Sequence, residues 1–289
     1  MPDDIPDIRG LFPRMDLSRR GFVVTTLATG FALSVKPAKA TIVTDTDGLT
    51  AGEVKIPVAD GEIPAYRAQP AHGTHFPVVI VVEEIFGVHE HIKDLCRRLA
   101  KLGYLAIAPE LYSRLGDVVS ITDIDKVVAI VNRAPDTQTL SDLDATAAWT
   151  EKHGGIHGKV AITGFCRGGR TVWMYCEHNP KVKAGVSWYG QLEGKTSDAF
   201  PSHPIDGAAN LKVPVLGLYA GKDQGITQQS IDDMKAALAK AHNKHCEFIV
   251  YPDAEHGFNA DYRPSYNEAA ATDGWKHMLA WFKQHGVAA

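Results

Sequence analysis

The stretch KVAITGFCRGGRTVWMYC, residues 159–176, decides the fold of this 289-residue chain. It begins with apolar and β-branched residues, turns through glycines, and leaves in the apolar spacing of a helix. This pattern predicts a strand, a sharp turn and a helix, with Cys166 at the turn. Gly164 and Gly168 lack the β-carbons that would collide at so tight a turn. The segment has the form of a nucleophile elbow in which cysteine replaces the more common serine.

The local setting of Cys166 would suit a reactive thiol. A helix beginning after it would direct its positive amino end at the sulfur, which favours the thiolate. The backbone N–H of Arg167 would be available as an oxyanion donor. A buried structural cysteine beside a glycine turn is the alternative interpretation of the same residues.

Strand and helix patterns alternate on both sides of this stretch. A leading hairpin is expected first, with Asp60 and Gly61 at its turn. Strands are expected at 52–58, 63–70, 76–87, 104–112, 159–165, 183–190, 213–221 and 246–254. Helices are expected at 89–103, 140–154, 167–179, 227–242 and 269–286, with Ser141 and Thr227 as N-caps. Such alternation predicts an α/β fold with a mostly parallel central sheet and helices on both faces.

The first forty residues differ from the rest. Arg19 and Arg20 precede a moderately apolar stretch, and Ala38-Lys39-Ala40 has the form of a cleavage site. We therefore expect residues 1–40 to be a twin-arginine export signal, read by the Tat machinery, and 41–289 to be a single domain. The mature protein would then be periplasmic. A helix packed on the domain is the alternative, and without processing the location would be cytoplasmic.

The bulk composition narrows the classes of partner. The chain is 45% hydrophobic and 22% charged, and its net charge of −4 includes no basic stripe, so a nucleic-acid partner is not expected. No segment favours a membrane span in the mature form. Dinucleotide and Walker motifs are absent from the sequence, and we expect no cofactor. The paired histidines His89 and His91 have i, i+2 spacing, which favours a loop before a helix over a metal site. A role at the entrance of the site is the alternative.

Four cysteines are present without a CxxC pair, which argues against zinc or thioredoxin-like chemistry. Cys96 and Cys176 fall at apolar helical positions, and Cys246 starts a strand. All three are expected to be structural. A disulfide among them after export remains open.

A nucleophile needs a base, and the base needs a group that orients it. In folds with a nucleophile elbow the chain order is nucleophile, acid, histidine. Asp223 and His256 follow two later strands in that order. Asp253 and Glu255 are alternative acids, but they lie close to His256 in sequence and are expected to be loop residues. We therefore predict a triad of Cys166, His256 and Asp223.

Several further blocks resemble one family. Besides the Cys166 elbow, they are Glu83-Glu84-Ile85-Phe86-Gly87-Val88, Pro109-Glu110-Leu111-Tyr112-Ser113-Arg114, Trp188-Tyr189-Gly190, and His256-Gly257-Phe258 with Arg263. From about residue 50 onward the chain resembles the dienelactone hydrolase (carboxymethylenebutenolidase) family of the α/β-hydrolase fold. This resemblance implies opening of small carboxylate-bearing enol lactones through a thioester.

The resemblance also implies roles for individual residues. Glu84 would be an extra catalytic carboxylate that is held by Arg263 at rest and takes the thiol proton when substrate displaces it. Arg263 and Arg114 would bind the substrate carboxylate, since guanidinium groups suit planar carboxylates. Tyr189 would line the pocket.

The oxyanion hole would combine the backbone N–H groups of Ile85 and Arg167. The long cationic side chain of Arg167 departs from the family pattern and leaves the substrate open. One alternative function is a broader thiol esterase for uncharged esters. Another is a non-catalytic binding or redox-sensing protein on the same scaffold.

Overall fold

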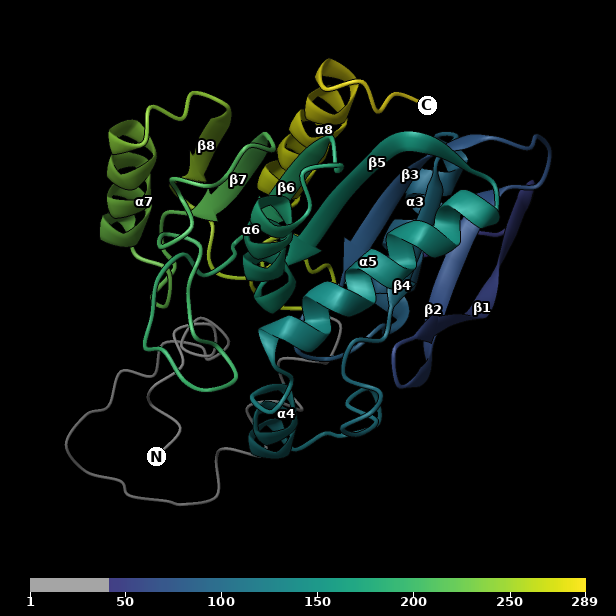
Figure 1. Cartoon of the computed structure of the whole chain (residues 1–289), viewed down its shortest axis with the longest axis horizontal. Helices are drawn as coiled ribbons and strands as arrows, with labels where there is room; N and C mark the ends of the chain where they lie inside the picture. The colour runs from purple at the N-terminus through teal and green to yellow at the C-terminus, as the bar shows by residue number, and fades with distance from the viewer. Residues whose placement is uncertain (1–41) are drawn as a thin grey trace.

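The structure is a computed structural model that describes residues 42–289 and begins with a hairpin (Figure 1). Strand β1 (Leu49–Val58) pairs antiparallel with β2 (Gly61–Pro70), and the predicted Asp60-Gly61 turn joins them. The proposed leader, residues 1–40, lies outside the described residues.

An eight-stranded sheet runs through the described part of the chain, in the order β1-β2-β4-β3-β5-β6-β7-β8. Strands β3 to β8 are mutually parallel, whereas β2 runs antiparallel to both of its neighbours. The remaining strands are β3 (Phe76–Val82), β4 (Leu105–Pro109), β5 (Gly155–Phe165), β6 (Ala184–Trp188), β7 (Val215–Ala220) and β8 (Cys246–Tyr251). The predicted mostly parallel sheet is confirmed.

Helices cover both faces of this sheet (Figure 1). They are α3 (Glu90–Lys101), α4 (Ile124–Val131), α5 (Asp136–Lys152), α6 (Arg167–His178), α7 (Gln228–Lys240) and α8 (Glu268–Gln284). Helices α5 and α6 pack side by side on one face, while α3 and α8 lie behind the sheet in Figure 1. Phe248 of β8 contacts both Trp173 of α6 and Lys235 of α7, so α7 shares the face of α6.

One expectation about the helices was wrong, and one helix was not expected. Helix α5 begins at Asp136 after the N-cap Pro135, so Ser141 lies inside it rather than capping it. The earlier start is supported by a tertiary contact, because Arg170 of α6 donates to both carboxylate oxygens of Asp136 at 2.7 Å. Helix α4 was not predicted, although the Asp123 side chain caps it by accepting from two backbone N–H groups.

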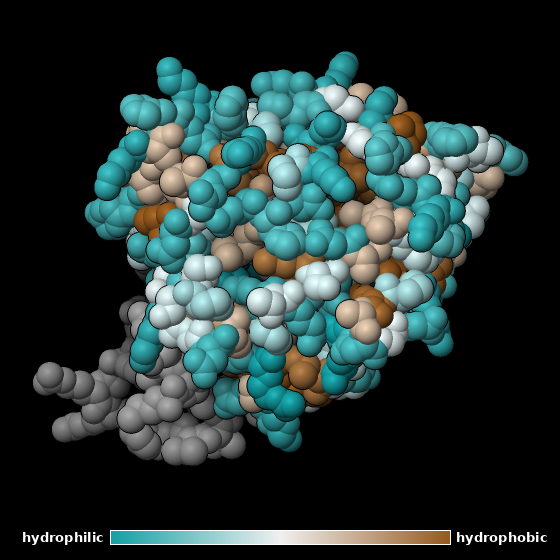
Figure 2. Space-filling model, in the orientation of Figure 1, coloured by the Kyte–Doolittle hydropathy of each residue, from teal (hydrophilic) through white to brown (hydrophobic). Residues whose placement is uncertain are grey.

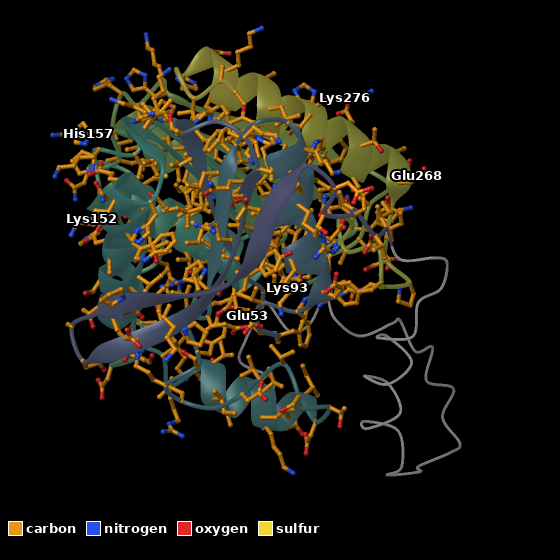
Figure 3. The ribbon with its side chains drawn as sticks, turned by 90° about the vertical axis from the view of Figure 1, so that its right-hand side faces the viewer. Glu53, Lys93, Lys152, His157, Glu268 and Lys276 are labelled. Atoms are coloured by element: carbon orange, nitrogen blue, oxygen red, sulfur yellow. The ribbon has the colours of Figure 1, made fainter. Side chains whose placement is uncertain are left out.

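The central strands are buried on both faces, as their apolar sequences predict. Every residue of β3, β4 and β6 is buried. The face seen in Figure 2 is mostly hydrophilic, with small scattered apolar patches. At the surface, Figure 3 shows Lys93 of α3 beside Glu53 of β1, and their Nζ and Oε1 atoms are 3.2 Å apart. None of the helices in residues 42–289 has both the length and the apolar character of a membrane span.

Candidate active site

Most of the predicted site residues converge at the carboxyl edge of the parallel strands, where they follow strands directly or by a short loop. Glu84 and Ile85 follow β3, and Cys166 follows β5. Tyr189 follows β6, and Asp223 and His256 come after β7 and β8. Parallel strands deliver their carboxyl ends to one edge of a sheet, so residues distant in sequence become neighbours there.

Cys166 occupies the sharp turn with a strained backbone, at φ 54° and ψ −114°. A non-glycine residue in such a conformation costs on the order of 1–3 kcal/mol. The turn is closed by glycine contacts: a β-carbon on Gly164 would lie 2.4 Å from the carbonyl oxygen of Gly168. A β-carbon on Gly168 would lie 2.4 Å from the carbonyl oxygen of Glu83. These contacts hold the amino end of α6 against the loop that carries Glu84.

His256 and Asp223 form a buried pair, with His256 Nδ1 2.7 Å from Asp223 Oδ2. The other oxygen of Asp223 accepts from the N–H groups of Gly225 and Ile226 at 2.8 and 3.0 Å. Burial raises the pKa of Asp223, but the charge and hydrogen bond of His256 outweigh it and lower that pKa. The carboxylate therefore stays ionised and holds the imidazole in one orientation.

The Cys166 thiol is one of the groups that raise the pKa of His256. Burial lowers the pKa of His256, yet the charges of Asp223 and Cys166 raise it well above its usual range. The ring Nε2 makes no hydrogen bond of standard geometry among the described residues, and the sulfur is close enough to affect the charge of the ring. A protonated imidazole beside the sulfur stabilises a thiolate.

Glu84 is fully buried and surrounded by donors. Tyr262 Oη donates to Glu84 Oε2 at 2.6 Å. The same oxygen lies 3.9 Å from His89 Nε2 and 3.9 Å from an Arg263 terminal nitrogen. Burial raises the pKa of Glu84, but Arg263 and His89 outweigh it and lower that pKa strongly. Glu84 is therefore a carboxylate at rest.

Aromatic rings enclose this cluster. Tyr189 is fully buried at a positive φ of 40°, and its ring meets the His256 ring edge-on at 5.1 Å between centroids. Its hydroxyl has no hydrogen-bond partner among residues 42–289. The Arg263 guanidinium lies 5.1 Å from the centre of the Phe86 ring and 5.5 Å from that of Tyr262. A flat cation between aromatic faces keeps its charge while water is excluded.

Comparison with known proteins identifies the family. Residues 63–286 match the description "Dienelactone hydrolase family".

The chain belongs to the dienelactone hydrolase family.

One relative, named "Putative carboxymethylenebutenolidase" from Methylorubrum extorquens, is 58% identical over 98% of both chains. A protein of the same name from Escherichia coli K12 is 52% identical over 91% of this chain and 98% of its own length. The solved "Putative Dienelactone Hydrolase" from Klebsiella pneumoniae is 53% identical, covers 82% of this chain and 99% of its own, and has a TM-score of 0.80. The chain is therefore a dienelactone hydrolase-like carboxylic ester hydrolase with the α/β-hydrolase fold.

Arg114 is the predicted site residue that this dienelactone hydrolase does not bring to the cluster. Its two terminal nitrogens donate to Asp60 in the hairpin turn and to Asp142 on α5. The Asp142 side chain is almost fully buried, and burial raises its pKa to about 6 although Arg114 opposes the rise. A buried carboxyl group needs a cation, and Arg114 supplies it. The geometry therefore does not support the expected substrate-binding role of Arg114.

The long Arg167 side chain stacks on an aromatic ring. Its guanidinium lies 3.9 Å from the centre of the Phe200 ring, so the long side chain packs on the 191–207 loop. Its backbone N–H lies at the amino end of α6, immediately after Cys166. The alternative acids are also placed: Asp253 is exposed and pairs with Lys222, and Glu255 is exposed.

The cluster has two further members: Tyr262, which sequence reasoning missed, and His89, for which a role at the site entrance was only the alternative. His89 was interpreted as part of a loop before a helix, and it is the N-cap residue of α3, yet its ring faces Glu84. Tyr262 precedes Arg263, and that adjacency was the available signal. Among residues 42–289, no three His, Cys, Asp or Glu side chains form a group suited to a metal ion. No disulfide joins Cys96, Cys166, Cys176 or Cys246 in the described part of the chain.

Proposed function

We propose that this family member opens small enol lactones that carry a carboxylate, through a thioester on Cys166. Three neighbouring features support the proposal: the strained cysteine, the buried Asp223–His256 pair, and a buried carboxylate, Glu84, beside Arg263. The pairing of Glu84 with Arg263 is the feature that indicates a carboxylate-bearing substrate. A carboxylate–guanidinium pair that is already built into the site can exchange its own carboxylate for that of a substrate.

The first half of the reaction forms the thioester. The substrate carboxylate pairs with Arg263, and Glu84, released from that arginine, takes the thiol proton. The sulfur attacks the lactone carbonyl carbon, and the developing oxyanion is held by the N–H groups of Ile85 and Arg167. The ring C–O bond then breaks. The leaving oxygen departs as an enolate, which becomes a ketone by taking at carbon the proton held by Glu84, so Glu84 is again a carboxylate.

The second half restores the enzyme. Water attacks the thioester carbonyl while His256 Nε2 accepts its proton. The C–S bond breaks and the sulfur leaves as the thiolate, which takes the proton held by His256. The product is a carboxylic acid that gives its proton to solvent and becomes a carboxylate. Asp223 holds the imidazole in place through both halves and stabilises its protonated form.

The test is turnover of dienelactone isomers by the wild-type chain and by Cys166→Ala. We expect wild-type turnover, loss of more than about 10³-fold in Cys166→Ala, and an acyl adduct on Cys166 in acid-quenched wild-type protein. Cys246→Ala is the matched control, because it removes a cysteine at the far end of the sheet. Equal turnover by Cys166→Ala and wild type would contradict the proposal.

A second candidate function is a broader thiol esterase for uncharged esters. The ion pairs of Arg114 favour it, because they occupy one of the two expected carboxylate-binding arginines. Comparing an acid lactone with its methyl ester separates the two. Equal kcat/KM for both would support the broader esterase.

For the leader, we propose export through the twin-arginine route with cleavage near residue 40. Arg19, Arg20 and the Ala38-Lys39-Ala40 site support it. The mass of the mature chain tests the proposal. A product recovered from the periplasm that still carries both arginines would contradict it.

A further inference from the structure

Arg114 is paired with Asp60 and Asp142, so it is not available to bind a substrate carboxylate beside Arg263. Arg263 is the one arginine next to Glu84 among the described residues, and its side chain is 6% exposed. A single guanidinium held 3.9 Å from its partner is a loose site for a free carboxylate. The second group that contacts the substrate must therefore come from the other neighbours of Glu84.

His89 has the placement that such a group requires. Its Nε2 is buried, lacks a hydrogen-bond partner in residues 42–289, and points to Glu84 Oε2. The His89 side chain is 18% exposed whereas Glu84 is fully buried, so His89 lies on the solvent side of the cluster. Its ring packs edge-on against Tyr262 at 4.9 Å between centroids, and this contact fixes the direction of Nε2.

We propose that His89, in place of Arg114, is the second side chain that binds the substrate carboxylate, beside Arg263. This inference rests on the proposed function. It adds His89, with the Tyr262 hydroxyl, to the group of donors that would receive the substrate.

The substrate carboxylate can take the place of the Glu84 carboxylate because both are anionic acceptors for the same donors. Tyr262, His89 and Arg263 all face the same oxygen of Glu84. When Glu84 turns toward Cys166, Tyr262 would lose its hydrogen bond, and His89 and Arg263 would lose the negative charge that they face. A buried donor left unpaired costs about 1–3 kcal/mol. A substrate carboxylate that takes the vacated position satisfies the three donors again. An uncharged ester offers acceptor oxygens but no negative charge to pair with Arg263.

The charges around His89 predict a dependence on pH. The groups that face it are Glu84, Arg263 and His91, with the rings of Phe86 and Tyr262. Burial lowers the pKa of His89 below its usual 6.5, although Glu84 opposes the shift. His89 is therefore neutral near pH 7 and becomes a cation as the pH falls. Preference for a carboxylated substrate should rise over the same range.

The experiment compares trans-dienelactone with its methyl ester, using the full chain between pH 5 and pH 8. The measured quantity is the ratio of kcat/KM for acid over ester, because ionisations of Cys166 and His256 are common to both and cancel. We expect His89→Ala to lower this ratio about tenfold, which corresponds to about 1.4 kcal/mol. We expect the wild-type ratio to rise below pH 6.5, and His89→Gln, which cannot titrate, to show a flat ratio.

Both variants should fold, because the His89 side chain makes no capping hydrogen bond to α3. His157→Gln is the matched control, since His157 is a surface histidine with 87% of its side chain exposed (Figure 3). It should leave both the ratio and its pH dependence unchanged.

The outcomes separate the two proposals. If wild type prefers the acid and His89→Ala keeps the same ratio, the role of His89 is wrong while the lactonase function stands. If wild type shows no preference for the acid, both the substrate class and the role of His89 are wrong. A lowered ratio that is flat with pH in His89→Gln supports both.

Discussion

Two buried Asp–His pairs lie within this one carboxyl edge, and they differ mainly in what faces the free nitrogen of the histidine. In the first, His256 Nδ1 is 2.7 Å from Asp223 Oδ2. In the second, His91 Nδ1 is 3.0 Å from Asp261 Oδ1, and both side chains are about 2% exposed. The Asp–His geometry alone therefore does not distinguish a catalytic pair from a structural one.

The surroundings of the two histidines distinguish them. The sulfur of Cys166 raises the pKa of His256. His91 instead contacts the rings of Phe165, Tyr262 and His89, and its Nε2 has no hydrogen-bond partner in the described chain. With no nucleophile at Nε2, the second pair has nothing to deprotonate.

The aspartates also differ in their other contacts. Asp223 accepts from two N–H groups of its own loop. Asp261 accepts from the N–H of Ile42 and from Arg98 of α3, and so joins segments 219 and 163 residues apart in sequence. The first pair orients a base, and the second fastens the loop that carries Tyr262 and Arg263 to the rest of the domain.

The largest effect expected from this contrast is on catalysis. Asp223→Asn should lower kcat about 10³- to 10⁴-fold, because the amide cannot hold the imidazole in the tautomer that serves the sulfur. Steady-state kinetics on a p-nitrophenyl ester measure it. A loss of less than tenfold would mean that the two pairs are functionally alike.

A second prediction concerns the position of the Cys166 sulfur relative to the Asp223–His256 pair. Gly168→Ala places a β-carbon 2.4 Å from the carbonyl oxygen of Glu83, so α6 and the Glu84 loop must separate. We expect kcat to fall about 10²-fold, as for a displacement of about 1 Å at a reacting group. Unfolding should be easier by about 1–3 kcal/mol. Unchanged kcat would show that the close contact does not position Cys166.

The third effect falls on stability. Asp261→Asn removes a buried charge that three groups share, and should lower the free energy of unfolding by about 2–3 kcal/mol. Its kcat should stay within about fivefold of wild type, in contrast to Asp223→Asn. Urea unfolding and esterase kinetics on the same preparation measure both. A loss of kcat as large as that of Asp223→Asn would reverse the assignment of the two pairs.

The smallest effect is the part of the pH dependence of the free energy of unfolding that comes from Asp261. Burial raises the pKa of Asp261, but the hydrogen bond and charge of His91 lower it below the usual 3.8. A lowered folded-state pKa gives stability that is present above about pH 5 and lost as the pH falls through that pKa. Asp261→Asn should therefore show a shallower loss of stability between pH 5 and pH 3. The urea midpoint at each pH measures it, and an unchanged slope would contradict it.

Local sequence was enough to predict the elbow and the sheet. The glycine spacing around Cys166 and the buried β-branched run before it follow from short-range sterics, and the structure has the expected strand, turn and helix. The placement of Asp223 and His256 could also be predicted, because parallel strands bring their carboxyl ends together whatever the side chains are. The start of α5 was missed because a pair with Arg170, remote in sequence, helps to set it.

The sequence by itself determined which residues could meet at the sheet edge, since strand order and the glycine turn depend on local patterns. Only the tertiary structure decided which partner each charge would take. Arg114 is bound by Asp60 and Asp142, whereas Glu84 is bound by Tyr262 and faces His89. The physical reason is that a buried charge pairs with whatever opposite charge or donor the packing brings within reach, and that choice is made between segments far apart in the chain.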